Sequence, residues 1–263
     1  MKYSMIISDF DGTLAEKAQI PEQSVKAIKK YVDKGGKFII CTGRMYQSIK
    51  NRMDEYGLKG IVACHQGAHI VDSDTGNTIY SVGMNKEFAV QAVKLAPKEC
   101  TPLAYIGADI YCERPCRYAE VFKDRCSINI VSDLSETLLN ATEPIYRMIY
   151  STEPDYVQGF LDKYSKIFEG KLIVNSGASY IVELVGLNQG KGNAVKFLAK
   201  YLNIPYDKIM TVGDSTNDIP LLDGEWHGVA VGTSHQDLKR VAKEITVPFN
   251  EFPIKYLIEK YGG

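Results

Sequence analysis

Short apolar runs alternate with helically periodic segments along the first part of the chain. Uninterrupted runs at 5–7, 38–41 and 61–64 are typical of strands buried on both faces of a parallel sheet. Between the first two runs, residues 21–34 carry apolar side chains at helical spacing and are followed by two glycines. A similar helical segment ends at Gly57, before the third run. This order of strands and helices predicts a parallel sheet with helical connections.

The same alternation returns in the last quarter of the chain. Residues 190–202 predict a helix, and the apolar runs at 209–212 and 229–232 predict two more buried strands. Residues 252–260 predict a closing helix. Functional groups are expected at the carboxyl ends of the parallel strands, where the connecting loops leave the sheet.

The central segment mixes helical and strand-like patterns without a strict alternation. Helices are expected near 86–95 and 154–168, and strands at 103–106, 145–150, 172–174 and 180–185. This mixture indicates an α+β unit whose own sheet is covered on one side. We therefore assign residues 1–82 and 188–263 to one α/β domain, and residues 83–187 to a second domain inserted into it.

Composition narrows the class of protein. The 263 residues are 45% apolar and 24% charged, which is typical of a globular protein with a real core. The net charge of −1 provides no field for holding nucleic acid or a membrane surface. The apolar run near the N-terminus is too short for a signal peptide or membrane span, and the six cysteines lack Cys-x-x-Cys spacing. These features predict a cytoplasmic protein with reduced thiols.

Two carboxylates, Asp9 and Asp11, follow the first apolar run, where a strand gives way to a glycine turn. Side chains two residues apart lie on the same side of an extended chain, so these acids would repel each other unless a cation lay between them. Gly12 lets the backbone turn, and Thr13 is expected to bond local backbone amides. Taken alone, the pair is also compatible with an acidic turn that merely ends the strand.

Other strand ends and one helix start add complementary groups. Thr42 supplies a hydroxyl group, Lys191 supplies a cation at a glycine-flanked helix start, and Asp214, Asn217 and Asp218 supply further oxygens. Mg²⁺ prefers oxygen ligands of this kind. Phosphoryl transfer needs a nucleophile in line with the leaving group and positive charge around the other phosphoryl oxygens. Each group alone has an ordinary structural role, but together they predict a phosphoryl-transfer site.

In this order the four stretches resemble the four motifs of the haloacid dehalogenase superfamily of phosphotransferases. They are residues 9–13, 42–44, Lys191 and 213–218, so the resemblance covers essentially the whole chain. It implies a Rossmann-like core, and the inserted segment resembles the α/β cap of the Cof-type hydrolases, which act mostly on small phosphorylated metabolites. The chain is thus identified as a phosphoric monoester hydrolase of the Cof-type branch, with a cap that selects the leaving group.

The resemblance also implies a role for each motif residue. Asp9 attacks phosphorus, and Asp11 serves first as acid and then as base. The phosphate would be bound by Thr42, Gly43, Lys191 and Asn217. Mg²⁺ would be bound by Asp9, the backbone carbonyl of Asp11, and Asp214. The residues that support the site would be Gly12, Arg44 and Asp218.

Two departures from the family pattern and two alternative functions remain. Ser215 stands where the family usually has glycine, and Gln66 stands where asparagine is usual, which leaves substrate contacts from that loop open. A phosphomutase would use the same core, and a non-enzymatic phospho-acceptor would also use a Mg²⁺-bound aspartate. The expected partner is a small phosphorylated metabolite rather than nucleic acid or membrane, and the expected oligomeric state is a monomer or weak homo-oligomer.

Overall fold

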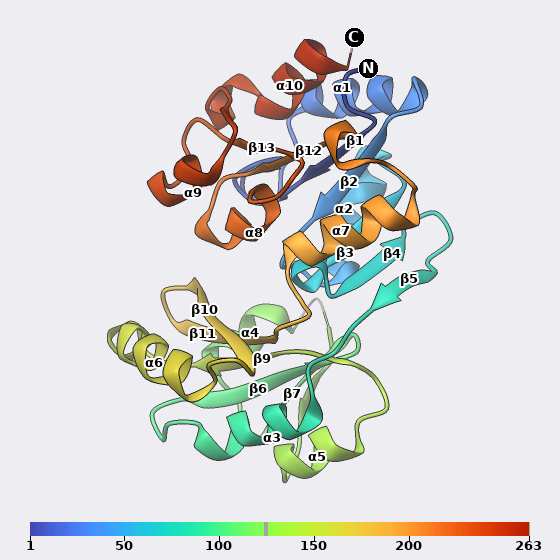
Figure 1. The fold of residues 1–263 in the computed structure, drawn as a ribbon. Coiled ribbons are helices and arrows are strands. Elements are labelled where there is room, and N and C mark those ends of the chain that lie inside the picture. Colours follow the sequence, from blue (N-terminus) through green and yellow to red (C-terminus); the bar gives the residue numbers. More distant parts are fainter. Residues whose placement is uncertain (124–125, 263) are drawn as a thin grey trace. The chain divides into compact units, whose positions relative to one another are not determined.

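The computed structural model describes residues 1–123 and 126–262, which divide into two compact units (Figure 1). Unit 1 comprises Met1–Tyr80 and Gly190–Gly263, and unit 2 comprises Ser81–Gln189. Each unit has its own sheet and its own apolar core. Within the described residues, no helix combines the length and apolar character needed to cross a membrane.

Unit 1 is built on an eight-stranded sheet with the order β14-β13-β12-β1-β2-β3-β4-β5. Its strands are β1 Met5–Ser8, β2 Lys37–Cys41, β3 Ile61–Cys64, β4 His69–Asp72, β5 Thr78–Ser81, β12 Ile209–Gly213, β13 His227–Ala230 and β14 Glu244–Ile245. The pairings from β14 through β3 are parallel, and β4 pairs with β3 in the antiparallel sense. The expected α/β class with a parallel sheet is therefore confirmed.

Helices cover both faces of the unit 1 sheet. They are α1 Glu22–Asp33, α2 Tyr46–Tyr56, α7 Lys191–Tyr201, α8 Ile219–Leu222, α9 Gln236–Val241 and α10 Pro253–Tyr261, with short 3₁₀ turns η1 His65–Gly67, η2 Tyr206–Lys208, η3 Thr216–Asp218 and η4 Phe249–Glu251. Strand β1 shows the two-residue alternation directly. Ile6 packs in a core with α1, α2 and α10, whereas Met5 and Ile7 pack in a second core with α7, α8 and α9.

Unit 2 contains a six-stranded sheet with the order β10-β11-β9-β6-β7-β8. Its elements are α3 Lys86–Leu95, β6 Thr101–Ile106, β7 Asp109–Cys112, α4 Arg117–Phe122, β8 Ile128–Ile130, α5 Leu134–Asn140, β9 Ile145–Ser151, α6 Pro154–Ile167, β10 Leu172–Ala178 and β11 Ile181–Gly186. Figure 1 shows α3, α5 and α6 gathered on one side of this sheet, where their apolar side chains form a single core with Met148, Tyr150 and Leu184.

The two chain segments that join unit 2 to unit 1 lie side by side within unit 2. The buried Gln189 side chain donates from Nε2 to the Val82 carbonyl, 2.9 Å away, and its Oε1 accepts from the Gly186 amide at 2.5 Å. An added Cβ on Gly186 would lie 3.3 Å from the Cα of Met84. The Gln189 side chain therefore hydrogen-bonds the segment where the chain enters unit 2 to the segment where it leaves.

All six cysteines are free, as the sequence predicted. Cys41, Cys64, Cys100 and Cys112 are buried, and burial raises the pKa of the Cys41 and Cys100 thiols to about 12. These thiols stay protonated at neutral pH and act as small apolar side chains.

Candidate active site

Three neighbouring strands of unit 1 end at the same edge of the sheet. β1 lies between β12 and β2, so the residues that follow these strands, Asp9, Thr42 and Asp214, lie at adjacent strand ends. Helix α7 begins at Lys191 and packs on the face that holds Met5 and Ile7. The parallel sheet thus gathers side chains that are as many as 205 positions apart in the chain at its carboxyl edge.

Lys191 is the centre of a buried ion cluster. Its Nζ donates to Asp9 Oδ1 and to Asp218 Oδ1, each at 2.5 Å. Lys191 is 1% exposed, Asp9 is 6% exposed and Asp218 is fully buried. Burial alone would lower the pKa of Lys191, but the carboxylates of Asp218 and Asp9 raise it by more, so the ammonium group stays charged. A fixed positive charge therefore lies beside the Asp9 carboxylate.

Asp218 also fixes the turn that follows β12. Its Oδ2 accepts from the backbone amides of Asp214 and Ser215, at 3.0 and 3.1 Å, and Ser215 completes a reciprocal capping box at η3. Both carboxylate oxygens of Asp218 are therefore engaged, one by Lys191 and one by the turn. Asp218 positions Lys191 and Asp214 relative to each other.

Asp214 faces the glycine turn after β1. Its Oδ1 accepts from the Thr13 hydroxyl at 2.7 Å. Gly12 has φ +81°, and a Cβ there would lie 2.4 Å from Asp214 Oδ2. Both the backbone conformation and the space therefore require glycine at this position.

Carboxylate oxygens of Asp9, Asp214 and Asp218 lie within 4.8 Å of one another. Burial is the main cause that raises the pKa of Asp9 and of Asp214; the Asp218 carboxylate also raises both, whereas Lys191 opposes the rise at Asp9. A second cation beside Asp9 and Asp214 would offset this cost of keeping both ionised. Oxygen ligands at this spacing suit a hard divalent cation, so the residues fit such a metal.

Asp11 lies outside this buried cluster. Its side chain is 51% exposed, and both its oxygens accept from the Arg44 guanidinium, at 2.7 Å from Nε and 2.6 Å from Nη2. The Arg44 guanidinium also lies 5.1 Å from the centre of the Phe10 ring. In this structure Arg44 therefore holds Asp11 in a bidentate ion pair between the ends of β1 and β2.

Thr42 and Gly43 form the wall next to Arg44. Thr42 is 1% exposed, and its Oγ1 accepts from the Arg44 amide at 3.1 Å. A Cβ on Gly43 would lie 2.8 Å from Gln66 Nε2, so the Gln66 amide closely approaches this loop. Gln66 and the preceding His65 have positive φ values of 58° and 49°, a strained conformation that is frequent at functional loops. Sequence reasoning treated Gln66 only as a departure from the family pattern.

The structure brings some of the predicted residues together and leaves others outside the cluster. Asp9, Lys191, Asp214 and Asp218 form one contiguous cluster, and Gly12 lies against Asp214. Asn217, which we expected to orient Lys191 or the phosphate, is exposed on η3, whereas Lys191 is buried and bonded to Asp9 and Asp218. Its role at the phosphate stays a prediction.

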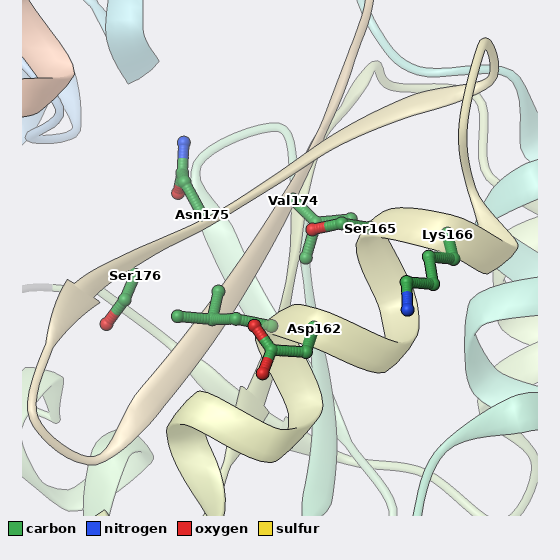
Figure 2. Close-up of a pocket in the computed structure, with 7 residues that line it drawn as sticks. Asp162, Ser165, Lys166, Val174, Asn175 and Ser176 are labelled. Carbon is green, nitrogen blue, oxygen red and sulfur yellow. The ribbon is translucent and has the colours of Figure 1, made fainter.

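Unit 2 contains a separate pocket of about 530 Å³ between α6 and β10 (Figure 2). It is lined by Leu161, Asp162, Ser165, Lys166, Val174, Asn175 and Ser176. None of these is a residue that the sequence assigned to the site. In Figure 2 the Asn175 side chain points away from α6, the helix that carries Asp162 and Lys166.

These features define an α/β protein with a buried acidic centre, neutralised in part by a lysine, at the carboxyl edge of a parallel sheet. The family model described as haloacid dehalogenase-like hydrolase matches residues 6–258, and the chain belongs to this family. The expected family is therefore confirmed, and with it the expectation of an enzyme of the hydrolase class.

Individual relatives match over almost their full length. The chain is 27% identical to the phosphatase YwpJ of Bacillus subtilis, over 97% of this chain and 98% of that protein. It is 24% identical to the 5-amino-6-(5-phospho-D-ribitylamino)uracil phosphatase YwtE of the same organism, over 97% and 96%. A crystal structure of a haloacid dehalogenase-like hydrolase from Bacteroides thetaiotaomicron is similar in fold, with a TM-score of 0.83, 22% identity, and 98% and 99% of the two chains covered.

Proposed function

We propose that this protein is a Mg²⁺-dependent phosphatase that hydrolyses small phosphorylated metabolites through an aspartyl-phosphate intermediate. The observation that carries the proposal is the buried Lys191 ammonium group, which bridges Asp9 and Asp218 at 2.5 Å each. Two relatives of this chain are named phosphatases, which agrees with the expected enzyme class, a phosphoric monoester hydrolase.

In the first step, an oxygen of Asp9 bonds to phosphorus while the bond from phosphorus to the leaving-group oxygen breaks. Asp9 is accessible to this role because Lys191 engages only its Oδ1 in the contacts described above. Asp11, once protonated and released from Arg44, gives its proton to the departing alkoxide. The products of this step are the free alcohol and phosphorylated Asp9.

In the second step, water attacks the phosphorus of phosphorylated Asp9. Asp11 takes one proton from that water, which returns Asp11 to the protonation state it needs for the next cycle. The bond between Asp9 and phosphorus breaks, and inorganic phosphate leaves.

The remaining residues bind the phosphoryl oxygens. Lys191 presents a fixed positive charge, and the Thr42 hydroxyl and the amides of the turn after Asp9 are available as donors. Mg²⁺, when bound, would neutralise charge on the phosphoryl group. Asp9, Asp214 and the backbone carbonyl of Asp11 would hold it, while Asp218, with both oxygens engaged, acts through Lys191 and the turn.

We propose in addition that unit 2 is the cap that binds the organic part of the substrate and excludes bulk water. Its sheet and its core are separate from those of unit 1, as expected of a unit whose ligand preference differs among related enzymes. The cytoplasmic location predicted from composition stays a prediction.

A panel of phosphate monoesters tests the proposed function. Purified protein freed of metal by a chelator should be inactive, and Mg²⁺ should restore phosphate release. The Asp9→Asn variant serves as the matched control because it nearly preserves the shape of the side chain. Phosphate release from no ester of the panel, or equal release by Asp9→Asn, would contradict the proposal.

A further inference from the structure

The two sheets of the described residues end in four edge strands, and one of these differs from the others in length. β14 has two residues, β8 three and β5 four, whereas β10, Leu172–Ala178, has seven. Natural proteins often keep edge strands short, or place charged residues or proline in them, because an unpaired edge can pair with another chain. β10 contains neither a charged residue nor proline. It is therefore the edge best suited to accept another strand.

The regular part of β10 is the stretch 172–175, in which each residue has one partner on β11. A register shift follows between Asn175 and Ala178. Among the described residues, no strand lies on the other side of β10. Ile173, at this edge, is apolar and yet 38% exposed. The outward-facing backbone groups of this stretch are therefore available to a further strand.

Helix α6 lies beside this edge of the sheet. Residues 168–171 join α6 to β10, so the helix runs back along the strand, and it contacts both β10 and β11. The pocket of about 530 Å³ described above is lined only by residues of α6 and β10, so it lies on the side of the helix away from β11 (Figure 2). We call β10 together with this side of α6 the α6/β10 edge.

The charged side chains on this side of α6 follow an order along the helix. Asp162 and Lys166 line the pocket, and Asp155 lies seven residues before Asp162, which places it on the same side of the helix. All three residues are exposed. Neither Asp155 nor Lys166 forms an ion pair with another described residue. An unpaired carboxylate therefore lies near the start of α6, and an unpaired ammonium group lies near its end.

This order of charges is self-complementary in a two-fold arrangement. Two copies of α6 that pack antiparallel place Asp155 of one copy beside Lys166 of the partner subunit, and the symmetry forms this ion pair twice. The antiparallel helix dipoles also attract each other. One copy of the chain thus supplies both halves of the contact.

The spacing of sheets and helices agrees with this arrangement. Neighbouring strands lie about 4.8 Å apart, so helices that lie over β10 and β11 in two copies of a continued sheet would be about 10 Å apart. Helices in contact pack about 8–10 Å apart, so each α6 would cover the open pocket beside the other.

We propose that the α6/β10 edge is a dimer interface, at which the sheet of unit 2 continues across a two-fold axis into a second copy of this chain. The two β10 strands pair antiparallel at the axis, and the two α6 helices pack beside each other. The contact is confined to one strand and one side of a helix, so the dimer belongs to the weak class that dissociates on dilution. This inference concerns assembly and does not depend on the proposed phosphatase activity.

Sedimentation velocity of the full chain between about 1 and 200 µM tests the association, and the sedimentation coefficient should rise with concentration from that of a monomer toward that of a dimer. Lys166→Glu should raise the Kd of the dimer by about tenfold, because it places two acidic side chains together at both symmetric contacts. Asp155→Lys should raise the Kd for the corresponding reason. The double variant should restore the wild-type Kd, since it only reverses the direction of each ion pair.

Two further variants separate the helix from the strand. Lys163→Glu is the matched control, because Lys163 is exposed on the same helix but does not line the pocket, and the Kd should not change. Ile173→Lys introduces a charge into the edge strand, where the symmetry brings it close to its own copy, and it should raise the Kd. Circular dichroism should show that each of these variants, all at exposed positions, retains the fold.

Amide hydrogen exchange at the two ends of the concentration range locates the interface. The amides of β10 should exchange more slowly at the high concentration, whereas those of β8, at the other edge of the same sheet, should not change. A chain that stays monomeric throughout, as it would if this edge bound a different protein or a small molecule, overturns the proposal. A dimer with unchanged exchange in β10, or a double variant that associates no more tightly than the single variants, also overturns it.

Discussion

At the scale of single residues, Asp9 and Asp11 differ sharply in their surroundings although they are two positions apart. Asp9 is buried against Lys191, whereas Asp11 is half-exposed and paired with Arg44. The two carboxylates are therefore suited to different steps, one to attack phosphorus from a fixed position and the other to carry a proton.

Asp9→Asn should abolish turnover while preserving the fold. A carboxamide oxygen is a poor nucleophile toward phosphorus, so we expect kcat to fall by several orders of magnitude. Circular dichroism should show an unchanged spectrum, and the unfolding temperature should stay close to that of the wild type. Near-normal hydrolysis by this folded variant would refute the assignment of Asp9 as nucleophile.

Asp11→Asn should act differently on different leaving groups. An alkoxide needs a proton to depart, but a nitrophenolate does not, so the rate of phosphorylation should fall far more with a sugar phosphate than with nitrophenyl phosphate. Rapid-quench measurement of phosphorylated protein separates this step from the later hydrolysis, which should also slow. An equal loss of the phosphorylation rate on both esters would mean that Asp11 serves only as a metal or structural ligand.

Asp214→Ala should weaken the binding of Mg²⁺ and the activity together. The variant removes a carboxylate that lies within metal-ligating distance of Asp9, and excess Mg²⁺ should restore activity only in part. Calcium should substitute poorly because its larger, more flexible coordination shell disturbs the in-line geometry. A Thr13→Val control, which removes only the 2.7 Å hydrogen bond to Asp214, should have a smaller effect. Full activity in chelator would contradict this prediction.

The sequence indicated which residues lie close together in the site, but not which hydrogen bonds and ion pairs they form. Asp9, Lys191 and Asp214 could be predicted because each follows a buried strand or begins a helix in a parallel sheet. The Thr13–Asp214 hydrogen bond could not, since it joins residues 201 positions apart and depends on the register that places Ser8 opposite Val212. The Arg44–Asp11 pair likewise depends on side-chain rotamers that no sequence pattern specifies.

At the scale of elements, α7 is held close to α8, and this contact fixes the position of Lys191. A Cβ on Gly192 would lie 2.4 Å from the Pro220 carbonyl oxygen. Gly192→Ala should therefore displace the first turn of α7, lowering both the free energy of unfolding and kcat. Denaturant titration and steady-state kinetics check the two effects.

Gly159 of α6 provides the matched control for this variant. It also lies within a helix, but an added Cβ there would meet no atom within 4 Å. Gly159→Ala should stabilise the protein by about 0.5–1 kcal/mol because alanine restricts the unfolded chain, and kcat should not change. If Gly192→Ala behaved in the same way, the close packing of α7 on α8 would not position Lys191.

Elements with a clear apolar pattern could be predicted, whereas elements without one could not. The expected helix at 86–95 agrees with α3, and the expected strand at 61–64 agrees with β3. Helices α4 and α5 were missed because six or seven residues carry too few turns to show a helical period. Strand β13 begins at His227 rather than 229, since pairing with Met210 extends it beyond its apolar residues.

At the scale of the whole molecule, unit 2 has what an independently folding domain needs. It has an apolar core of its own, and its six strands pair with one another in a sheet of their own. Its two ends are joined by the Gln189 hydrogen bond to Val82. A protein consisting of residues 81–189 should therefore fold alone and unfold in one cooperative transition. Calorimetry would test this, and Gln189→Ala in the same fragment should lower the transition temperature. A fragment without a cooperative transition would contradict the prediction.

The hydrogen bonds that Gln189 makes between the two ends of unit 2 also have a consequence for the evolution of such a chain. The two ends of unit 2 are adjacent. For the folding of unit 1, the inserted segment is therefore equivalent to a loop whose ends are close together, whatever the number of residues in that segment. The entropic cost of closing a loop grows only with the logarithm of the loop's length. An insert of 109 residues therefore costs unit 1 little more free energy of folding than a much shorter loop would. Recombination at this junction could therefore exchange one insert for another while the hydrolytic centre stayed intact.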